Sequence, residues 1–187
     1  MRKVIATCVL AGLICGNFST ANAEDGSEVR KNWEFQVESS HGKDNIHNYG
    51  VHVLQKMHQK DSVSFYRGLN ITRSTSDSKI GWNGIWVNHG EGFGIGPEAM
   101  IRLDSHISGK LHAHWDFGGS FMFFNKSYPY SELTYGFMWR TGPGLRWQYN
   151  DDDSLLMNLY GSHFNNMKSN GSDYNTVGFS VGYSHKF

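Results

Sequence analysis

Residues 176–184, within the segment 174–187, alternate strictly between apolar residues and small or polar ones, and this pattern constrains the fold more than any other feature of the chain. One face carries Val177, Phe179, Val181 and Tyr183, and the other carries Gly178, Ser180, Gly182 and Ser184. Successive side chains of a strand point to opposite faces, so the pattern predicts a β-strand rather than a helix. The segment ends on Phe187 in the apolar phase, which is typical of the last strand of a bacterial outer-membrane barrel.

The same alternation recurs in seven earlier segments. They are residues 33–38, 48–53, 62–72, 93–103, 111–123, 133–149 and a segment that begins at Leu155. Short polar turns at 59–61, 104–109 and 150–153 alternate with longer loops, including 41–45 and 74–92. An even number of strands, joined alternately by short turns and long loops, predicts an all-β fold: an eight-stranded antiparallel transmembrane β-barrel.

The chemistry of the two faces indicates which one meets the lumen. The strands of a soluble ligand-binding barrel also alternate between apolar and polar residues, so the two-residue period alone does not show whether the apolar face lies inside or outside. The polar face carries charges of both signs, which can pair inside a narrow lumen. These residues are Glu34, Arg102, Asp116, Arg140 and Arg146. The other face is crowded with Trp, Tyr and Phe, which suit lipid and its interfaces. We therefore expect an apolar exterior and a polar interior.

The N-terminus predicts export from the cytoplasm. Residues 1–23 combine basic Arg2 and Lys3 with an apolar run and a small-residue cleavage site, which is typical of a secretory signal peptide. Residues 24–187 then form one barrel domain, located in the outer membrane. No later stretch has the ~20 apolar residues of a transmembrane helix. Both cysteines lie in the signal, so we expect no disulfide in the mature domain.

The charge balance gives no reason to expect a nucleic-acid partner. Without Arg2 and Lys3, 15 of the 17 basic residues remain against 17 acidic ones. A nucleic-acid-binding domain normally carries a clear basic excess.

Three segments, 111–124, 133–145 and 163–187, together resemble the outer-membrane lipid A 3-O-deacylases. The N-terminal half matches this family only in the layout of its strands. The resemblance implies a small eight-stranded barrel whose partner is outer-membrane lipid, the lipid A of lipopolysaccharide. It also implies a serine esterase without a cofactor or a metal ion.

The family's seventh strand carries a His-x-Ser-Asn motif, and residues 163–166 here are His-Phe-Asn-Asn. By this resemblance His163 is the general base and Asn166 stabilises the oxyanion. Asp173, or alternatively Asn175, orients the histidine. Asn165 stands where the nucleophilic serine is expected, and an asparagine is a poor nucleophile. The resemblance therefore supplies every expected group except the nucleophile.

The phase of these residues predicts where they lie. His163, Asn165 and Asp173 share the phase of the apolar face, so we expect them on the lipid-facing side near the outer rim. Such a position suits a membrane-resident acyl substrate. Ser162 is predicted to point to the opposite face. Ser169 and Ser172 lie in the following loop. A polar rim without catalytic activity remains the alternative interpretation.

His112, His114 and Asp116 share one face of a strand at alternate positions. Such a spacing can supply metal ligands. A hydrogen-bonded network in the lumen with Arg140 and Arg146 explains it better.

Two functional hypotheses follow. The first is a barrel that hydrolyses, or descends from barrels that hydrolyse, an ester-linked acyl chain of lipid A. The second is a non-catalytic barrel with a structural, surface-interaction or adhesion role, in which the loop 74–92 meets an external partner. A channel is not favoured, because eight strands enclose a lumen that their own side chains fill. In both cases we expect the barrel assembly machinery to recognise the C-terminal strand. The sequence leaves open whether the protein forms a homodimer.

Overall fold

The computed structural model describes residues 31–76, 79–82, 85–88, 90–126, 134–165 and 173–187. Eight long strands form the barrel: β1 (Asn32–Gly42), β2 (His47–Lys60), β3 (Val63–Thr75), β6 (Glu91–Ser108), β7 (Leu111–Phe124), β8 (Tyr135–Gln148), β9 (Asp153–Asn165) and β10 (Tyr174–Lys186). Two short strands, β4 (Lys79–Trp82) and β5 (Ile85–Asn88), pair as a separate hairpin, and η1 (Lys43–Asn45) is a single 3₁₀ turn. The predicted signal peptide lies outside the described residues.

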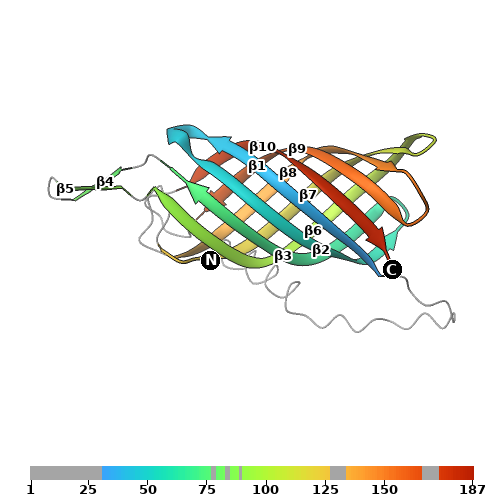
Figure 1. Cartoon of the computed structure of the whole chain (residues 1–187), viewed down its shortest axis with the longest axis horizontal. Helices are drawn as coiled ribbons and strands as arrows, with labels where there is room; N and C mark the ends of the chain where they lie inside the picture. The colour runs from blue at the N-terminus through green and yellow to red at the C-terminus, as the bar shows by residue number, and fades with distance from the viewer. Residues whose placement is uncertain (1–30, 77–78, 83–84, 89, 127–133, 166–172) are drawn as a thin grey trace, which may run out of the picture.

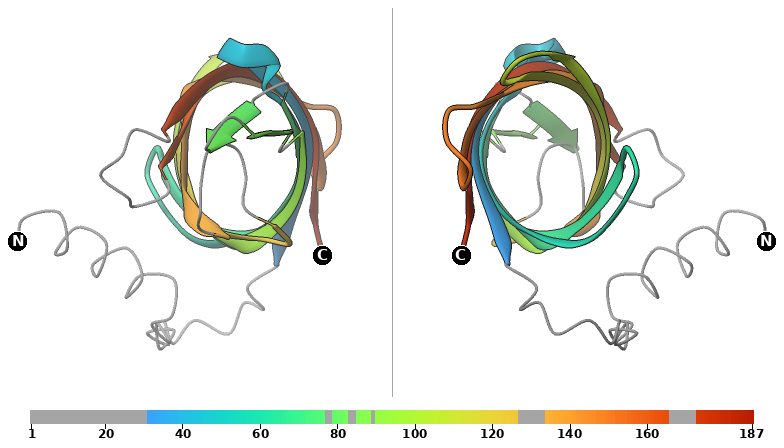
Figure 2. Two further views of the ribbon diagram at one scale, coloured as in Figure 1. Left: turned by 90° about the vertical axis from the view of Figure 1, so that its left-hand side faces the viewer. Right: turned by 90° about the vertical axis from the view of Figure 1, so that its right-hand side faces the viewer.

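The sheet closes on itself. Around the barrel the strands follow the order β1-β10-β9-β8-β7-β6-β3-β2, and every neighbouring pair is antiparallel. The first and last strands complete the ring, with Asn32 opposite Lys186 and Gly42 opposite Thr176. The view along the axis in Figure 2 shows the resulting closed ring. The predicted fold, an eight-stranded antiparallel β-barrel, is confirmed.

Several strands, β6 above all, are longer than the alternation alone predicted. The expected turn 104–109 is mostly strand, because β6 and β7 continue to pair as far as Ser108 and Leu111. Only Gly109 and Lys110 connect them, and Gly109 has the positive φ of 54° that a tight turn favours. Similarly, the expected loop 74–92 contains the β4–β5 hairpin and the ends of β3 and β6. Polar side chains at the rim do not stop backbone pairing, so hydrophobic alternation underestimates strand length.

The two ends of the barrel differ in their connections. The short turns between β2 and β3, β6 and β7, and β8 and β9 lie at the end that holds the C-terminus. The strand ends that the longer connections join, and the β4–β5 hairpin, lie at the opposite end (Figure 1). Bacterial barrels of this type have short periplasmic turns and longer external loops. The end with the longer connections is therefore the outer end, and we call its edge the outer rim.

The outside of the barrel is apolar. Large hydrophobic side chains are exposed around its circumference, among them Val37, Phe65, Phe117, Leu145, Leu159 and Phe179. Water would penalise so large an apolar surface, whereas the hydrocarbon of a bilayer accommodates it. The wall of the barrel therefore faces lipid. No helix among the described residues is long and apolar enough to cross a membrane.

Side chains fill the inside of the barrel. Near the outer end Ile46, Met122, Phe124, Met138, Phe164 and Tyr174 form a buried apolar cluster. The middle holds buried charged and amide groups. One small cavity of about 10 Å³ lies beside Asp116, Arg140 and Asn158, which is room for about one water molecule.

Candidate lipid-facing site at the outer rim

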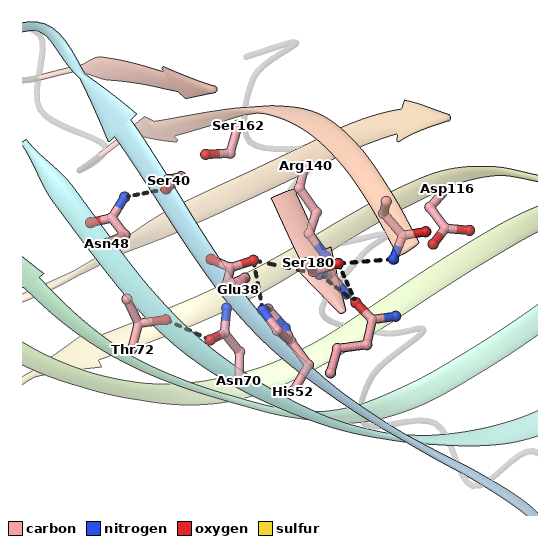
Figure 3. Close-up of polar contacts among 12 residues, drawn as sticks. Glu38, Ser40, Asn48, His52, Asn70, Thr72, Asp116, Arg140, Ser162 and Ser180 are labelled. Atoms are coloured by element: carbon pink, nitrogen blue, oxygen red, sulfur yellow. Dashed lines mark hydrogen bonds and ion pairs between the residues drawn. The ribbon is translucent and has the colours of Figure 1, made fainter. Parts of the chain in front are cut away.

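The lumen holds the largest group of charged side chains, and its geometry indicates a structural role. His52 on β2 is fully buried, with Nδ1 2.7 Å from Glu98 Oε2 and Nε2 2.8 Å from Glu38 Oε2. Figure 3 shows the ring of His52 reaching Glu38. The Nδ1 contact with Glu98 is a hydrogen bond in which the ring donates, because a carboxylate only accepts. Arg140 adds a guanidinium 3.0 Å from Glu98 and 3.6 Å from Glu38.

A second group of ions crosses the lumen nearer the periplasmic end. The fully buried guanidinium of Arg102 donates to both oxygens of Glu34, at 2.7 and 2.9 Å. It also donates to both oxygens of Asp116, at 2.8 Å each. The pairing of opposite charges expected in the lumen is thus present. Its members come from strands β1, β6 and β7, so it ties distant parts of the chain together.

The partners of the β7 polar residues differ in part from the expected ones. Asp116 is bonded to Arg102, and His114 lies 2.5 Å from Asn158 Oδ1. Arg146 pairs instead with Asp104, at 3.2 Å. Among the described residues, no group of three or more His, Cys, Asp or Glu side chains could hold a metal ion.

The residues predicted as a site come together at the outer rim. His163 and Asn165 end β9, and Asp173 and Asn175 stand at the start of β10. The register places His163 directly opposite Asn175. We call these four residues the rim cluster. Asn166, Ser169 and Ser172 lie outside the described residues.

Within the rim cluster, hydrogen bonds connect the two strands in pairs. His163 Nδ1 lies 2.9 Å from Asn175 Oδ1, and Asn165 Nδ2 donates to Asp173 Oδ2 at 3.1 Å. His163 Nε2 is 4.0 Å from Asp173 Oδ2. The amide oxygen of Asn175 accepts from Nδ1–H of His163, while Nε2 of the ring faces the carboxylate of Asp173. Both residues expected to orient the ring thus lie next to it, Asn175 at hydrogen-bond distance and Asp173 farther away.

The rim cluster faces outward and remains accessible. The side chains of His163 and Asp173 are 41% and 40% exposed. On its other side His163 lies opposite Trp139 of β8, which is also exposed. Exposed Trp side chains at the edge of a barrel are typical of the membrane interface. The cluster therefore faces outward at the outer rim, as the strand phase predicted.

The nearest serine in the sequence points the other way. Ser162 is opposite Thr176, and the two hydroxyls lie 2.5 Å apart on the lumen side (Figure 3 shows Ser162). Its predicted orientation is thus observed. At the position of the missing nucleophile, the nitrogen of Asn165 is engaged by the carboxylate of Asp173. The described part of the cluster offers an imidazole ring and amide groups, which suit hydrogen bonding to a polar headgroup.

The lipid-facing wall next to the rim cluster carries no side chain at one position. Gly161 is exposed two residues before His163 on the same face of β9, and an added Cβ there would meet no atom within 4 Å. Its neighbours across the sheet are Thr141 on β8 and Val177 on β10. Trp115 Nε1 donates to Thr141 Oγ1 at 2.9 Å. We call this outward-facing position without a side chain the Gly161 notch.

Comparison with known proteins supports the fold but not a family. No protein-family model matches the sequence, and no curated protein matches it. Among solved structures, the chain is similar to the outer membrane enzyme PagL, with a TM-score of 0.62 and 9% identity. That match covers 82% of this chain and 99% of PagL. The outer membrane protein OprG from Pseudomonas aeruginosa matches with a TM-score of 0.50 and 8% identity, over 87% of this chain and 98% of OprG.

The fold and the apolar outer surface together define the class of protein. A closed eight-stranded barrel with an apolar outer wall, similar in fold to PagL and OprG, is an outer-membrane β-barrel. The chain is such a barrel, located in the outer membrane. At identities of 8% and 9%, these two matches establish the fold alone.

Proposed function

We propose that this barrel binds lipid A from the outer leaflet at the rim cluster and does not cleave it. The observation that supports the proposal best is the arrangement of His163 and Asn175 on the lipid-facing side, directly beside the Gly161 notch. The ring and amide groups offer hydrogen bonds to a sugar or an acyl amide. The notch offers room for a hydrocarbon chain. The resemblance of residues 163–187 to lipid A 3-O-deacylases supports lipid A as the ligand.

The chemistry of the cluster supports binding over hydrolysis. A serine esterase needs a hydroxyl beside the base and, in most cases, a carboxylate that stabilises the imidazolium formed when the base takes the proton. Here Nδ1 of His163 bonds to an amide, which carries no negative charge. The side chain at the nucleophile position is Asn165, whose nitrogen donates to Asp173. Loss of a catalytic serine costs orders of magnitude in rate.

Native mass spectrometry of the detergent-folded mature protein with added lipid A tests the binding. We expect a one-to-one complex for the wild type. The substitution Gly161→Trp fills the notch, and we expect it to weaken the complex by about tenfold, equivalent to ~1.4 kcal/mol. Met157→Trp adds bulk to the same face of β9, farther from the rim, and is the matched control. Equal lipid A retention by the wild type and Gly161→Trp would contradict the proposal.

Ester hydrolysis of lipid A is the second candidate, favoured by the exposed position of His163 at the outer rim. It requires a hydroxyl from outside the described residues, where Ser169 and Ser172 lie. Mass spectrometry of lipid A from cells with and without the protein separates the two functions. Unchanged acylation is expected for a binding protein. Loss of one acyl chain, abolished by His163→Ala, would establish hydrolysis instead.

A further inference from the structure

A pair of histidines lies at the outer rim, away from the rim cluster. His41 near the end of β1 and His47 at the start of β2 are direct cross-strand partners. Their ring centroids are 4.5 Å apart, with an angle of 46° between the ring planes. His41 is exposed and His47 is half-buried, so solvent reaches the pair. The 3₁₀ turn η1 connects the two strands beyond the pair.

The backbone pairing brings these two side chains close. Gly42 N donates to Ile46 O at 2.8 Å, so the neighbouring pair Gly42–Ile46 is the hydrogen-bonded one. Bonded and non-bonded pairs alternate along an antiparallel ladder, which makes His41–His47 a non-hydrogen-bonded pair. The Cα atoms of such pairs are only about 4.5 Å apart. Ile46 is buried and anchors the turn, so the two imidazoles are held side by side.

Two adjacent imidazoles are metal ligands of the kind that Zn²⁺ and Cu²⁺ prefer. Bound to one Zn²⁺ at about 2.0–2.1 Å each, their nitrogens need to approach to about 3.3 Å. Rotation of two rings that are already in contact achieves this. Within the described part of the chain, no hydrogen bond engages the ring nitrogens of His41 or His47. They are therefore available to a metal ion.

A second histidine pair provides an internal comparison. His106 on β6 and His112 on β7 are also cross-strand partners, with ring centroids 5.0 Å apart, but they lie at the periplasmic end. His106 Nε2 lies 3.2 Å from the carbonyl oxygen of Gly109, so that nitrogen is protonated and cannot bind a metal. In register, His112 also lies opposite Arg146, whose positive charge disfavours a cation. Proximity alone therefore does not make this pair a site.

We propose that His41 and His47 form a binding site for a borderline divalent metal ion such as Zn²⁺ or Cu²⁺ at the outer rim. The protein supplies two neutral imidazoles, and water molecules complete the coordination. The site is open, so oxygen ligands from outside the protein can replace those waters. This site is independent of the lipid-binding function proposed for the rim cluster.

Isothermal titration of the full mature barrel, folded in detergent without a polyhistidine tag, tests the site with Zn²⁺. The wild type should bind one Zn²⁺ at neutral pH. His47→Asn removes one of two protein ligands and should weaken binding by about tenfold or more. His112→Asn is the matched control in the other pair, and its affinity should stay within about twofold of the wild type.

Electron paramagnetic resonance of bound Cu²⁺ identifies the ligands directly. We expect hyperfine splitting from two imidazole nitrogens in the wild type and from one in His41→Asn. Heat-modifiable migration on gels verifies that each variant is folded. The proposal is overturned if the wild type binds no Zn²⁺, or if His41→Asn and His47→Asn bind as tightly as the wild type. It is equally overturned if His112→Asn loses the site.

Discussion

Two histidines of this barrel, His52 in the lumen and His163 at the outer rim, contrast in their surroundings. His52 is fully buried, and each ring nitrogen faces a carboxylate. His163 is 41% exposed, and its Nδ1 faces an amide. A buried polar ring must be paired with other polar groups, so the contacts of His52 stabilise the lumen. His163 is open to solvent and lipid, as a binding residue requires.

The same contrast holds between the two regions as a whole. The lumen binds strands together through charges from β1, β2, β6, β7 and β8, and loss of one charge leaves others unpaired. The His163–Asn175 and Asn165–Asp173 hydrogen bonds of the rim cluster join the end of β9 to the start of β10, and the cluster is open to lipid and solvent. We therefore expect lumen substitutions to affect stability and rim substitutions to affect binding. Four predictions test this division.

The largest effect is expected for Arg102→Met in the lumen. This substitution leaves Glu34 and Asp116 buried without their shared cation, and breaking a buried ion pair costs about 3–5 kcal/mol. The measurement is urea unfolding of the barrel in detergent micelles. Arg73→Met is the control, because the Arg73–Glu91 pair is exposed (59% and 52%) and such pairs contribute about 0–1 kcal/mol. If the two substitutions lowered the free energy of unfolding equally, the lumen charges would not stabilise the barrel more than an exposed ion pair does.

A smaller loss is expected for His52→Phe. Glu38 and Glu98 lose one donor each but keep Arg140, so we expect a cost of about 2–3 kcal/mol in the free energy of unfolding. The same urea titration measures it. His58→Phe changes an exposed histidine of the same strand and should stay within about 0.5 kcal/mol of the wild type. A silent His52→Phe would argue that Arg140 alone neutralises both carboxylates.

Glycine substitutions compare the inner and outer faces without changing charge. In Gly96→Ala the new Cβ collides with the carbonyl oxygen of Phe121, so we expect a loss of about 1–3 kcal/mol. In Gly161→Ala the methyl group enters open space and should change stability by less than about 0.5 kcal/mol. Thermal unfolding followed by circular dichroism compares the pair. A destabilised Gly161→Ala would mean that the notch is not open.

The smallest effect on stability is expected for His163→Ala. Its partners are exposed, so the free energy of unfolding should change by less than about 0.5 kcal/mol. Lipid A retention in native mass spectrometry should nevertheless fall, because a hydrogen-bonding group for the headgroup is lost. A variant that is destabilised by several kcal/mol but retains lipid A would reverse the roles assigned to the two regions.

Much of the fold could be predicted from the sequence, because the required signal is local. Alternation around Val177, Phe179 and Val181 identifies both the strand and its lipid-facing side. The ends of strands were less predictable. The segment 104–108 is polar but remains paired with β7, since its backbone hydrogen bonds do not depend on side-chain hydrophobicity.

The candidate site was predictable only in outline. Strand phase places His163, Asp173 and Asn175 on one side, but it does not say which of the latter two faces the histidine. The register between β9 and β10 selects Asn175. Similarly, the exact partners of His52 come from β1 and β6, and no local pattern links those segments.

The sequence by itself determined which side chains face lipid and which face the lumen, because that choice repeats every two residues along each strand. Only the tertiary structure decided which polar groups meet across strands. Closure of the barrel sets the stagger between neighbouring strands, and this stagger brings His52 between two carboxylates, His163 beside an amide and His41 beside His47.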